Sequence, residues 1–434
     1  MIKKIRTGLI LERITLGILG VTLFLRLLIY RFFPTSPEQS MKEVSIAAGR
    51  ADMIIVSVLL AAAILFLAKL ILNKEPFPRT TLDIPLLIFF AAAAASFLYS
   101  EERISTATGV ISLLVNISVF YALAGCLNSD YRRKLFMVLL IGSGLTAALL
   151  GLIHYFFIYG SMPKADLAGF AQHMVDIKRI GSLFGWPNIF AGFLMLVILP
   201  SISLVLVLKD RKEKFWAAFV AIVLILAMFL TRSILCWASF MAGIALFGYM
   251  LIRMKRGMVK DRKLKLIWVS TAALLAVFFF LIVQKRIDLF TKSSVTARIE
   301  YLRILFTIIK THPFLGSGFN TFGIMSSRLM SVPEGFSMYA HNTYLEIWSG
   351  TGLAGFFAFI WMVLAIVKHG FKNIVNIKTP ENKILFLGVF CGVFAFLIDN
   401  LFNFTLLYPH TSLFWWISLA IIFSWERNGT GKLA

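Results

Sequence analysis

Long and almost uninterrupted hydrophobic runs dominate the chain, and polar residues gather in the short segments between the runs. A helix that crosses a lipid bilayer needs about 20 mostly apolar residues. The sequence contains twelve such runs, and most of the segments between them are short. We expect transmembrane helices at residues 10–32, 51–72, 82–100, 106–127, 135–157, 187–208, 214–231, 234–252, 265–284, 343–367, 383–405 and 409–425.

This pattern predicts an all-α, polytopic membrane protein. A membrane β-barrel would show short segments of alternating polarity instead of continuous apolar runs. Hydrophobic residues make up 59% of the chain and charged residues 15%, whereas a soluble domain carries about 25% charged residues. The composition therefore excludes a soluble enzyme. No polar stretch is long enough for a separate soluble domain, so we expect one transmembrane domain over residues 1–434.

The distribution of charge predicts the orientation of these helices. The chain has 43 Lys and Arg against 21 Asp and Glu, a net charge of +22. Such an excess in a soluble protein would suggest nucleic acid. Here 25 basic residues fall in segments on the same side as the amino terminus, and eight fall in the five opposite loops other than residues 286–340. Because basic residues are retained in cytoplasmic loops, we expect both termini in the cytoplasm, contact with membrane lipids and no nucleic-acid partner.

Two segments on the outer side are unusually long, residues 158–186 and residues 286–340. Long loops between compact elements are commonly functional. Within the second, residues 297–310 (ARIEYLRILFTIIK) place apolar side chains at helical spacing, with cations between them. This spacing predicts an amphipathic helix that lies on the membrane surface or caps a cavity.

Both long loops, and the start of the span that follows the second, carry residues suited to phosphate chemistry. Arg179 and Arg298 offer forked guanidinium donors that match phosphoryl oxygens. Glycines such as Gly181 and Gly316 would let backbone amides approach an anion closely. His341, at the mouth of a span, can accept a hydroxyl proton. These parts together favour transfer of a group from a lipid-linked pyrophosphate to a hydroxyl acceptor.

At these positions the chain resembles the O-antigen ligase and O-antigen polymerase superfamily of bacterial inner membranes. The motifs that carry the resemblance are Arg179-x-Gly181 with Pro187-Asn188, Arg298 followed by Pro313-x-x-Gly316-x-Gly318, and His341-Asn342-x-Tyr344-Leu345. The resemblance implies an inverting, metal-independent glycosyl transferase that acts in the periplasm and uses no cofactor. Its donor would be a glycan on undecaprenyl pyrophosphate, and its acceptor would be lipid A core.

The resemblance also assigns roles to individual residues. Arg179 and Arg298 would bind the pyrophosphate leaving group, and His341 would activate the acceptor hydroxyl. Asn342 would orient the histidine or the sugar. Further residues that we expect near the site are Gly181, Asn188, Gly316, Gly318, Arg232, Arg303, Arg26 and Asp399. No cysteine or histidine pattern indicates a metal site.

The sequence departs from the family pattern in two places. Members often carry Ser-Arg near the outer end of the seventh span, where this chain has Thr231-Arg232-Ser233. Members often carry an acidic residue just before the glycines that follow the His-Asn motif. Here that residue is absent and Glu346 lies one turn earlier, so a substitute role for Glu346 stays open.

Three other functions are consistent with parts of the sequence. A polymerase of the same superfamily, or a protein O-oligosaccharyltransferase, would share the donor residues and differ in the acceptor. A secondary transporter would place ionisable residues near the bilayer midplane, at the interface of paired halves. Here the polar residues gather at one face, which favours the enzyme. The aromatic run Phe414-Trp415-Trp416 suggests an interfacial belt.

Overall fold

The computed structural model describes residues 2–28, 40–158, 179–255, 293–329 and 339–425. These residues form helices joined by loops, with no strand among them, which confirms the all-α fold. The helices are α1 (Ile2–Leu28), α2 (Ser40–Asn73), α3 (Asp83–Tyr99), α4 (Arg103–Cys126), α5 (Asp130–Ile153), a π-helical turn (His154–Ile158), a 3-10 turn (Ser182–Phe184), α8 (Pro187–Val207), α9 (Arg211–Leu230), α10 (Ile234–Lys255), α12 (Ser293–Thr311), α13 (Phe322–Leu329), α14 (Thr343–Asn376), α15 (Pro380–Asp399) and α16 (Pro409–Ser424).

Nine helices in the described part of the chain are long and apolar enough to cross a membrane. They correspond to nine of the expected spans. The expected spans at 82–100 and 409–425 form the shorter helices α3 and α16, of 17 and 16 residues. The expected span at 265–284 lies outside the described residues. The chain is therefore a multi-pass membrane protein, and the number twelve stays a prediction.

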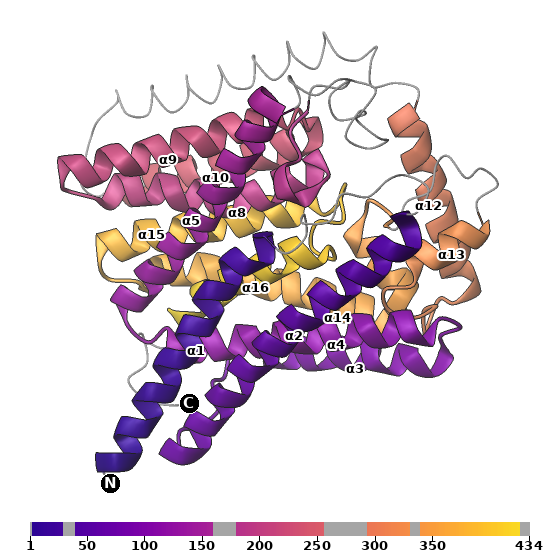
Figure 1. Ribbon diagram of the computed structural model, residues 1–434, viewed down its shortest axis with the longest axis horizontal. Coiled ribbons are helices and arrows are strands. Elements are labelled where there is room, and N and C mark those ends of the chain that lie inside the picture. The colour runs from indigo at the N-terminus through magenta and orange to yellow at the C-terminus, as the bar shows by residue number, and fades with distance from the viewer. Residues whose placement is uncertain (1, 29–39, 159–178, 256–292, 330–338, 426–434) are drawn as a thin grey trace.

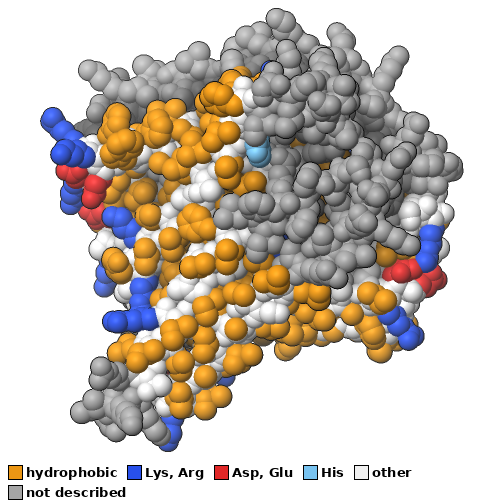
Figure 2. Space-filling model, viewed as in Figure 1, with side chains coloured by type: hydrophobic (Ala, Val, Ile, Leu, Met, Phe, Trp, Pro, Cys, Tyr) orange, Lys and Arg blue, Asp and Glu red, His pale blue; other side chains and the backbone are white. Residues whose placement is uncertain are grey.

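Most helices lie side by side and run between two ends of the molecule, with α12 and α13 at one end (Figure 1). Figure 2 shows mainly hydrophobic side chains over the middle of the visible face, whereas Lys, Arg, Asp and Glu gather toward its edges. This distribution suits a bundle that is surrounded by lipid along its length and reaches water at its ends.

The centre of the bundle is built from α8, α15 and α16. Helices α8 and α15 pack closely because Gly388 and Gly392 lie on one face of α15. A Cβ atom at either glycine would come within 2.8 Å of a backbone carbonyl of α8, that of Leu199 or Met195. Small residues four apart commonly allow such close helix packing in membranes. This contact brings the start of α8 next to the end of α15, where polar side chains meet.

Helix α16 is enclosed on all sides, and every residue from His410 to Ser424 is buried. Trp415 and Trp416 are 0% and 2% exposed. The interpretation of this aromatic run as an interfacial belt was therefore wrong. An interior helix and a lipid-facing helix are both hydrophobic all round, so their sequences look alike.

Helix α12 covers residues 297–310, where the apolar spacing predicted a helix. Its inner face joins α13 and the residues before α14 in a small hydrophobic core separate from the main one, made of Tyr301, Ile304, Leu305, Ile308, Phe322 and Ala340. Its outer face leaves Ile299 and Phe306 exposed by 60% and 47%. Because Arg298 and Tyr301 lie one turn apart, packing of α12 brings both side chains toward the start of α14.

Candidate functional site

His341 lies between α12 and α14, in a left-handed backbone conformation with φ of 55°. Its imidazole ring stacks on the ring of Tyr301, with centroids 5.5 Å apart and an angle of 10° between the planes. The ring of Phe404 meets it edge to face at 4.8 Å. Two aromatic side chains from distant parts of the sequence therefore fix the orientation of the imidazole.

The surroundings of His341 favour its neutral form. Burial, together with the positive charge of Arg298, lowers the pKa of the imidazole from 6.5 to about 3. The Nδ1 atom is buried and has no hydrogen-bond partner among the described residues. The neutral imidazole has one ring nitrogen with a free lone pair, which can accept a hydrogen bond or a proton.

Arg298 lies near the start of α12, close enough to interact electrostatically with both His341 and Asp399. Burial lowers the pKa of its guanidinium, and the nearby Cys236 and Asp399 oppose that shift. A guanidinium keeps its charge throughout the physiological range. No carboxylate lies within ion-pair distance of Arg298 among the described residues. The arginine therefore brings positive charge to His341.

Arg179 approaches the same region from the start of α8. Its Nε donates to the backbone carbonyl of Thr231, at the end of α9, over 2.8 Å. Its charge interacts with Cys236, and the charge of Arg298 interacts with the same thiol. The two arginines that the sequence singled out are thus brought near one side chain, although 119 positions separate them in the chain. Arg232 directly follows Thr231 and is half-buried, with φ of 50°.

A buried polar network lies beneath these cations. Asn188 donates to Asn403 over 3.1 Å, and Asn403 donates to the Asp399 carboxylate over 2.7 Å. The hydroxyl of Thr405 donates to the other carboxylate oxygen over 3.2 Å. Asp399 is fully buried. The network satisfies the buried carboxylate with neutral donors and brings the expected residues Asn188 and Asp399 together.

The same network holds the His341-Asn342 segment. The backbone N–H of Thr343 donates to the carbonyl of Asn400 over 3.0 Å, and its hydroxyl donates to the Asn400 side chain over 2.7 Å. The side chain of Asn342 accepts from the N–H of Leu345 over 3.0 Å and caps α14. Asn342 therefore supports His341 through the backbone, and its expected role toward the sugar stays a prediction.

Comparison with known families finds a match over the part of the chain that contains Arg298 and His341. Residues 219–360 match the family model described as O-antigen ligase. This stretch is similar to an O-antigen ligase domain. The match includes Arg298 and His341, and it confirms the resemblance inferred from the motifs. No curated protein matches the chain.

The glycines of the matched stretch serve packing. The N–H groups of Gly316 and Gly318 donate to the carbonyls of His312 and Gly350. A Cβ atom at Gly316 would lie 2.4 Å from the Gly350 backbone. Helix α14 is kinked at Gly352, where φ is 67°. The amides of Gly316 and Gly318 are therefore engaged within the protein, and the expectation that glycines here offer amides to an anion needs correction.

Gly181 likewise shapes a turn. Its carbonyl accepts from the N–H of Phe184 over 3.2 Å, and a Cβ atom would lie 2.3 Å from the carbonyl oxygen of Gly185. The hydroxyl of Ser182 donates to the Ala147 carbonyl over 2.5 Å. The turn thus fixes the backbone next to Arg179 against α5. Only glycine fits at position 181, because a side chain there would collide with the carbonyl of Gly185.

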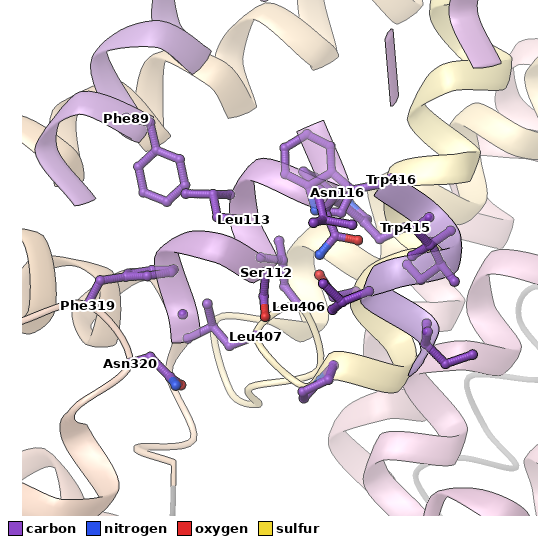
Figure 3. A pocket seen from close by; sticks show the side chains of 18 of the residues that line it. Phe89, Ser112, Leu113, Asn116, Phe319, Asn320, Leu406, Leu407, Trp415 and Trp416 are labelled. Atoms are coloured by element: carbon purple, nitrogen blue, oxygen red, sulfur yellow. The ribbon is translucent and has the colours of Figure 1, made fainter. Parts of the chain in front are cut away.

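Two further expected residues, Arg303 and Arg26, have surroundings of a different kind. Arg303 is on the exposed face of α12, 78% exposed, and pairs with Glu300 at 3.7 Å. Arg26 is buried and lines a mostly apolar cavity of about 130 Å³. In Figure 3, Phe89 and Phe319 lie toward one end of this cavity and Trp415 and Trp416 toward the other. The carbonyl of Arg26 contacts the ring of His410. Arg26 therefore lies beside α16.

Sequence reasoning missed Tyr301, Phe404 and Asn400. The first two are aromatic residues in hydrophobic surroundings, and nothing in their spacing marks them as neighbours of a histidine. Asn400 stands in the polar run Asp399-Asn400-Leu-Phe-Asn403 at the end of a span. Asparagine is uncommon at such a depth unless it is hydrogen-bonded, so that run did carry a signal.

Proposed function

We propose that this protein transfers a glycan from undecaprenyl pyrophosphate to a hydroxyl group of lipid A core, at the periplasmic face of a bacterial inner membrane. The family match supports a glycosyltransferase of the ligase and polymerase type. The observation that carries the finer proposal is the meeting of a neutral His341 with Arg298, beside a second arginine at Arg179.

The two arginines would bind the diphosphate of the donor. Guanidinium groups match phosphoryl oxygens with paired hydrogen bonds, and they stabilise the negative charge that the leaving group gains as its bond to the sugar breaks. Arg298 lacks a carboxylate partner among the described residues, so its charge is free to meet an anion.

His341 would accept the proton of the acceptor hydroxyl. The hydroxyl oxygen then attacks the anomeric carbon from the side opposite the diphosphate. The new carbon–oxygen bond forms while the bond to the phosphate oxygen breaks, and undecaprenyl pyrophosphate departs with both bonding electrons. Attack from the opposite side inverts the anomeric configuration. The proton taken by His341 is later released to water, which restores the neutral base.

The position of the site agrees with a lipid-linked substrate. His341 precedes α14 and Asp399 ends α15, so both lie at the end of the bundle that the charge distribution places outside. The polyprenyl tail prefers hydrocarbon, and the diphosphate needs polar partners at the headgroup level. A transporter would instead use ionisable groups near the middle of its spans.

The direct test is to incubate the purified protein with a lipid-linked oligosaccharide, alone and with lipid A core. A glycosylated lipid A core would support the proposal. Growth of the lipid-linked glycan itself, with or without the core, would identify a polymerase. Absence of both products from folded, purified protein would contradict glycan transfer.

A further inference from the structure

Glu346 lies one turn into α14 with its side chain inside the protein, only 7% of the residue being exposed. Its Oε2 atom accepts a hydrogen bond from the backbone N–H of Ala340 over 2.7 Å. Ala340 immediately precedes His341. The carboxylate therefore reaches back across the start of its own helix and holds the peptide that leads into the candidate base.

This contact matters because His341 has an unfavourable backbone conformation. A backbone φ of 55° is unfavourable for a residue other than glycine, and it persists only where the surroundings enforce it. The hydrogen bonds of Thr343 hold the chain after His341. The bond from Ala340 to Glu346 holds the chain before it. The two sets of contacts together fix the turn that aims the imidazole.

The aromatic contacts of His341 depend on the same turn. Tyr301 and Phe404 face the imidazole from two directions, and both reach it only if its ring projects from the left-handed position. Loss of the bond at Ala340 would let the residue relax toward ordinary backbone angles. The ring would then leave its stack on Tyr301.

We propose that Glu346 is a positioning residue for His341, acting through the backbone of Ala340. The inference rests on the proposed glycan transfer for its kinetic test. Positioning of His341 needs a hydrogen-bond acceptor at residue 346, and it does not need proton transfer by the carboxyl group. An amide oxygen can therefore replace the carboxylate oxygen.

The test compares Glu346→Gln, which keeps an acceptor of the same length, with Glu346→Met, which fills similar volume without one. Glu300→Gln, on the exposed face of α12, is the matched control. We expect Glu346→Gln to keep kcat within about threefold of the unsubstituted protein. We expect Glu346→Met to lose kcat on the order of 10²-fold, with KM for the donor unchanged, because only the base is misplaced. Glu300→Gln should leave both constants unchanged.

Two kinetic results would overturn the proposal. If Glu346→Gln falls as far as Glu346→Met, the carboxylate itself transfers a proton or carries a needed charge. If Glu346→Met keeps full kcat, the hydrogen bond to Ala340 has no part in catalysis.

A second readout does not depend on glycan transfer. Diethyl pyrocarbonate modifies neutral imidazole, and mass spectrometry can follow the modification at His341 alone. We expect the rate at His341 to change severalfold in Glu346→Met and to stay unchanged in Glu346→Gln. Equal rates in all variants would contradict the positioning role. Absence of transfer by the unsubstituted protein would contradict the proposed function and leave this readout valid.

Discussion

At one end of the bundle the buried carboxylate of Glu12 lies between two cations, whereas at the opposite end the buried carboxylate of Asp399 is held by neutral donors. Glu12 forms ion pairs with Arg132 and with Lys69, the latter at 3.7 Å. Asp399 accepts hydrogen bonds from Asn403 and Thr405. The first arrangement neutralises charge within the protein. The second leaves a nearby arginine, Arg298, without an ion-pair partner among the described residues.

The difference separates charges that hold the fold together from charges that await a ligand. Buried cations are normally paired, because removal from water is costly. The end that contains Glu12 obeys this rule with protein groups alone, and it also joins Arg133 to the backbone carbonyl of Ser424 over 3.0 Å. At the other end Arg298 faces His341. We infer that the negative charge of a substrate pairs with Arg298 there.

The largest expected effect is on glycan transfer, at the end of the bundle that contains His341. His341→Ala should lower glycan transfer on the order of 10²–10⁴-fold, the usual contribution of a general base. Donor binding and the thermal unfolding midpoint should remain near those of the unsubstituted protein. The measurement is transfer rate together with donor affinity in purified membranes. Near-normal transfer would remove His341 from the mechanism.

The next effect is on the free energy of unfolding, through the ion pairs at the end of the bundle that contains Glu12. Glu12→Gln should lower the free energy of unfolding by about 3 kcal/mol, because Arg132 loses its buried carboxylate partner and Lys69 keeps only Glu75. Transfer per folded molecule should stay the same. Lys209→Ala is the control, since its pair with Glu381 lies on the surface, where ion pairs contribute little. Equal stability of both variants in thermal unfolding would show that the Glu12 pairs do not support the fold.

A smaller effect shows whether the site arginines act through the paired hydrogen bonds of the guanidinium or through positive charge alone. Arg298→Lys and Arg179→Lys should each lower kcat/KM for the donor by about 10-fold or more, because an ammonium cannot form the paired bonds of a guanidinium. Arg303→Lys, on the same helix as Arg298 but exposed, should have no effect. Full activity of the two site variants would leave them only a general charge role.

The smallest expected effect is the absence of a change with pH. Since the pKa of His341 lies at about 3, the imidazole is neutral above that value, and its capacity as a base is lost only as pH falls through it. The kcat/KM of the free enzyme should therefore stay flat between pH about 7 and pH about 5. A half-maximal value near 6.5, the ordinary histidine pKa, would show that the imidazole is solvated.

The sequence predicted the helices of the bundle well because hydrophobic runs are a strong signal that needs no knowledge of contacts. The spacing of apolar residues also predicted α12, and the residue types at Arg179, Arg298 and His341 suggested the chemistry that we propose. These predictions depend on local pattern and on the properties of single side chains.

The remaining features depend on packing and could not be predicted in the same way. The glycines at Gly316 and Gly318 signalled a close approach. The sequence could not tell that the approaching group is the backbone of α14 at Gly316 and the side chains of Ser100 and Thr106 at Gly318. The ring of Tyr301 reaches His341 only because α12 folds onto the start of α14. The buried position of Trp415 follows from the enclosure of α16 by other helices.

The central claim is that Arg298 and Arg179 bind the diphosphate of the donor next to His341. Its most direct test is the affinity of the purified protein for undecaprenyl pyrophosphate without a glycan, compared among the unsubstituted protein, Arg298→Ala and Arg303→Ala. We expect Arg298→Ala to weaken binding by about 10-fold or more, the loss of a charged hydrogen bond, and Arg303→Ala to leave it unchanged. Undiminished binding by Arg298→Ala would contradict the account.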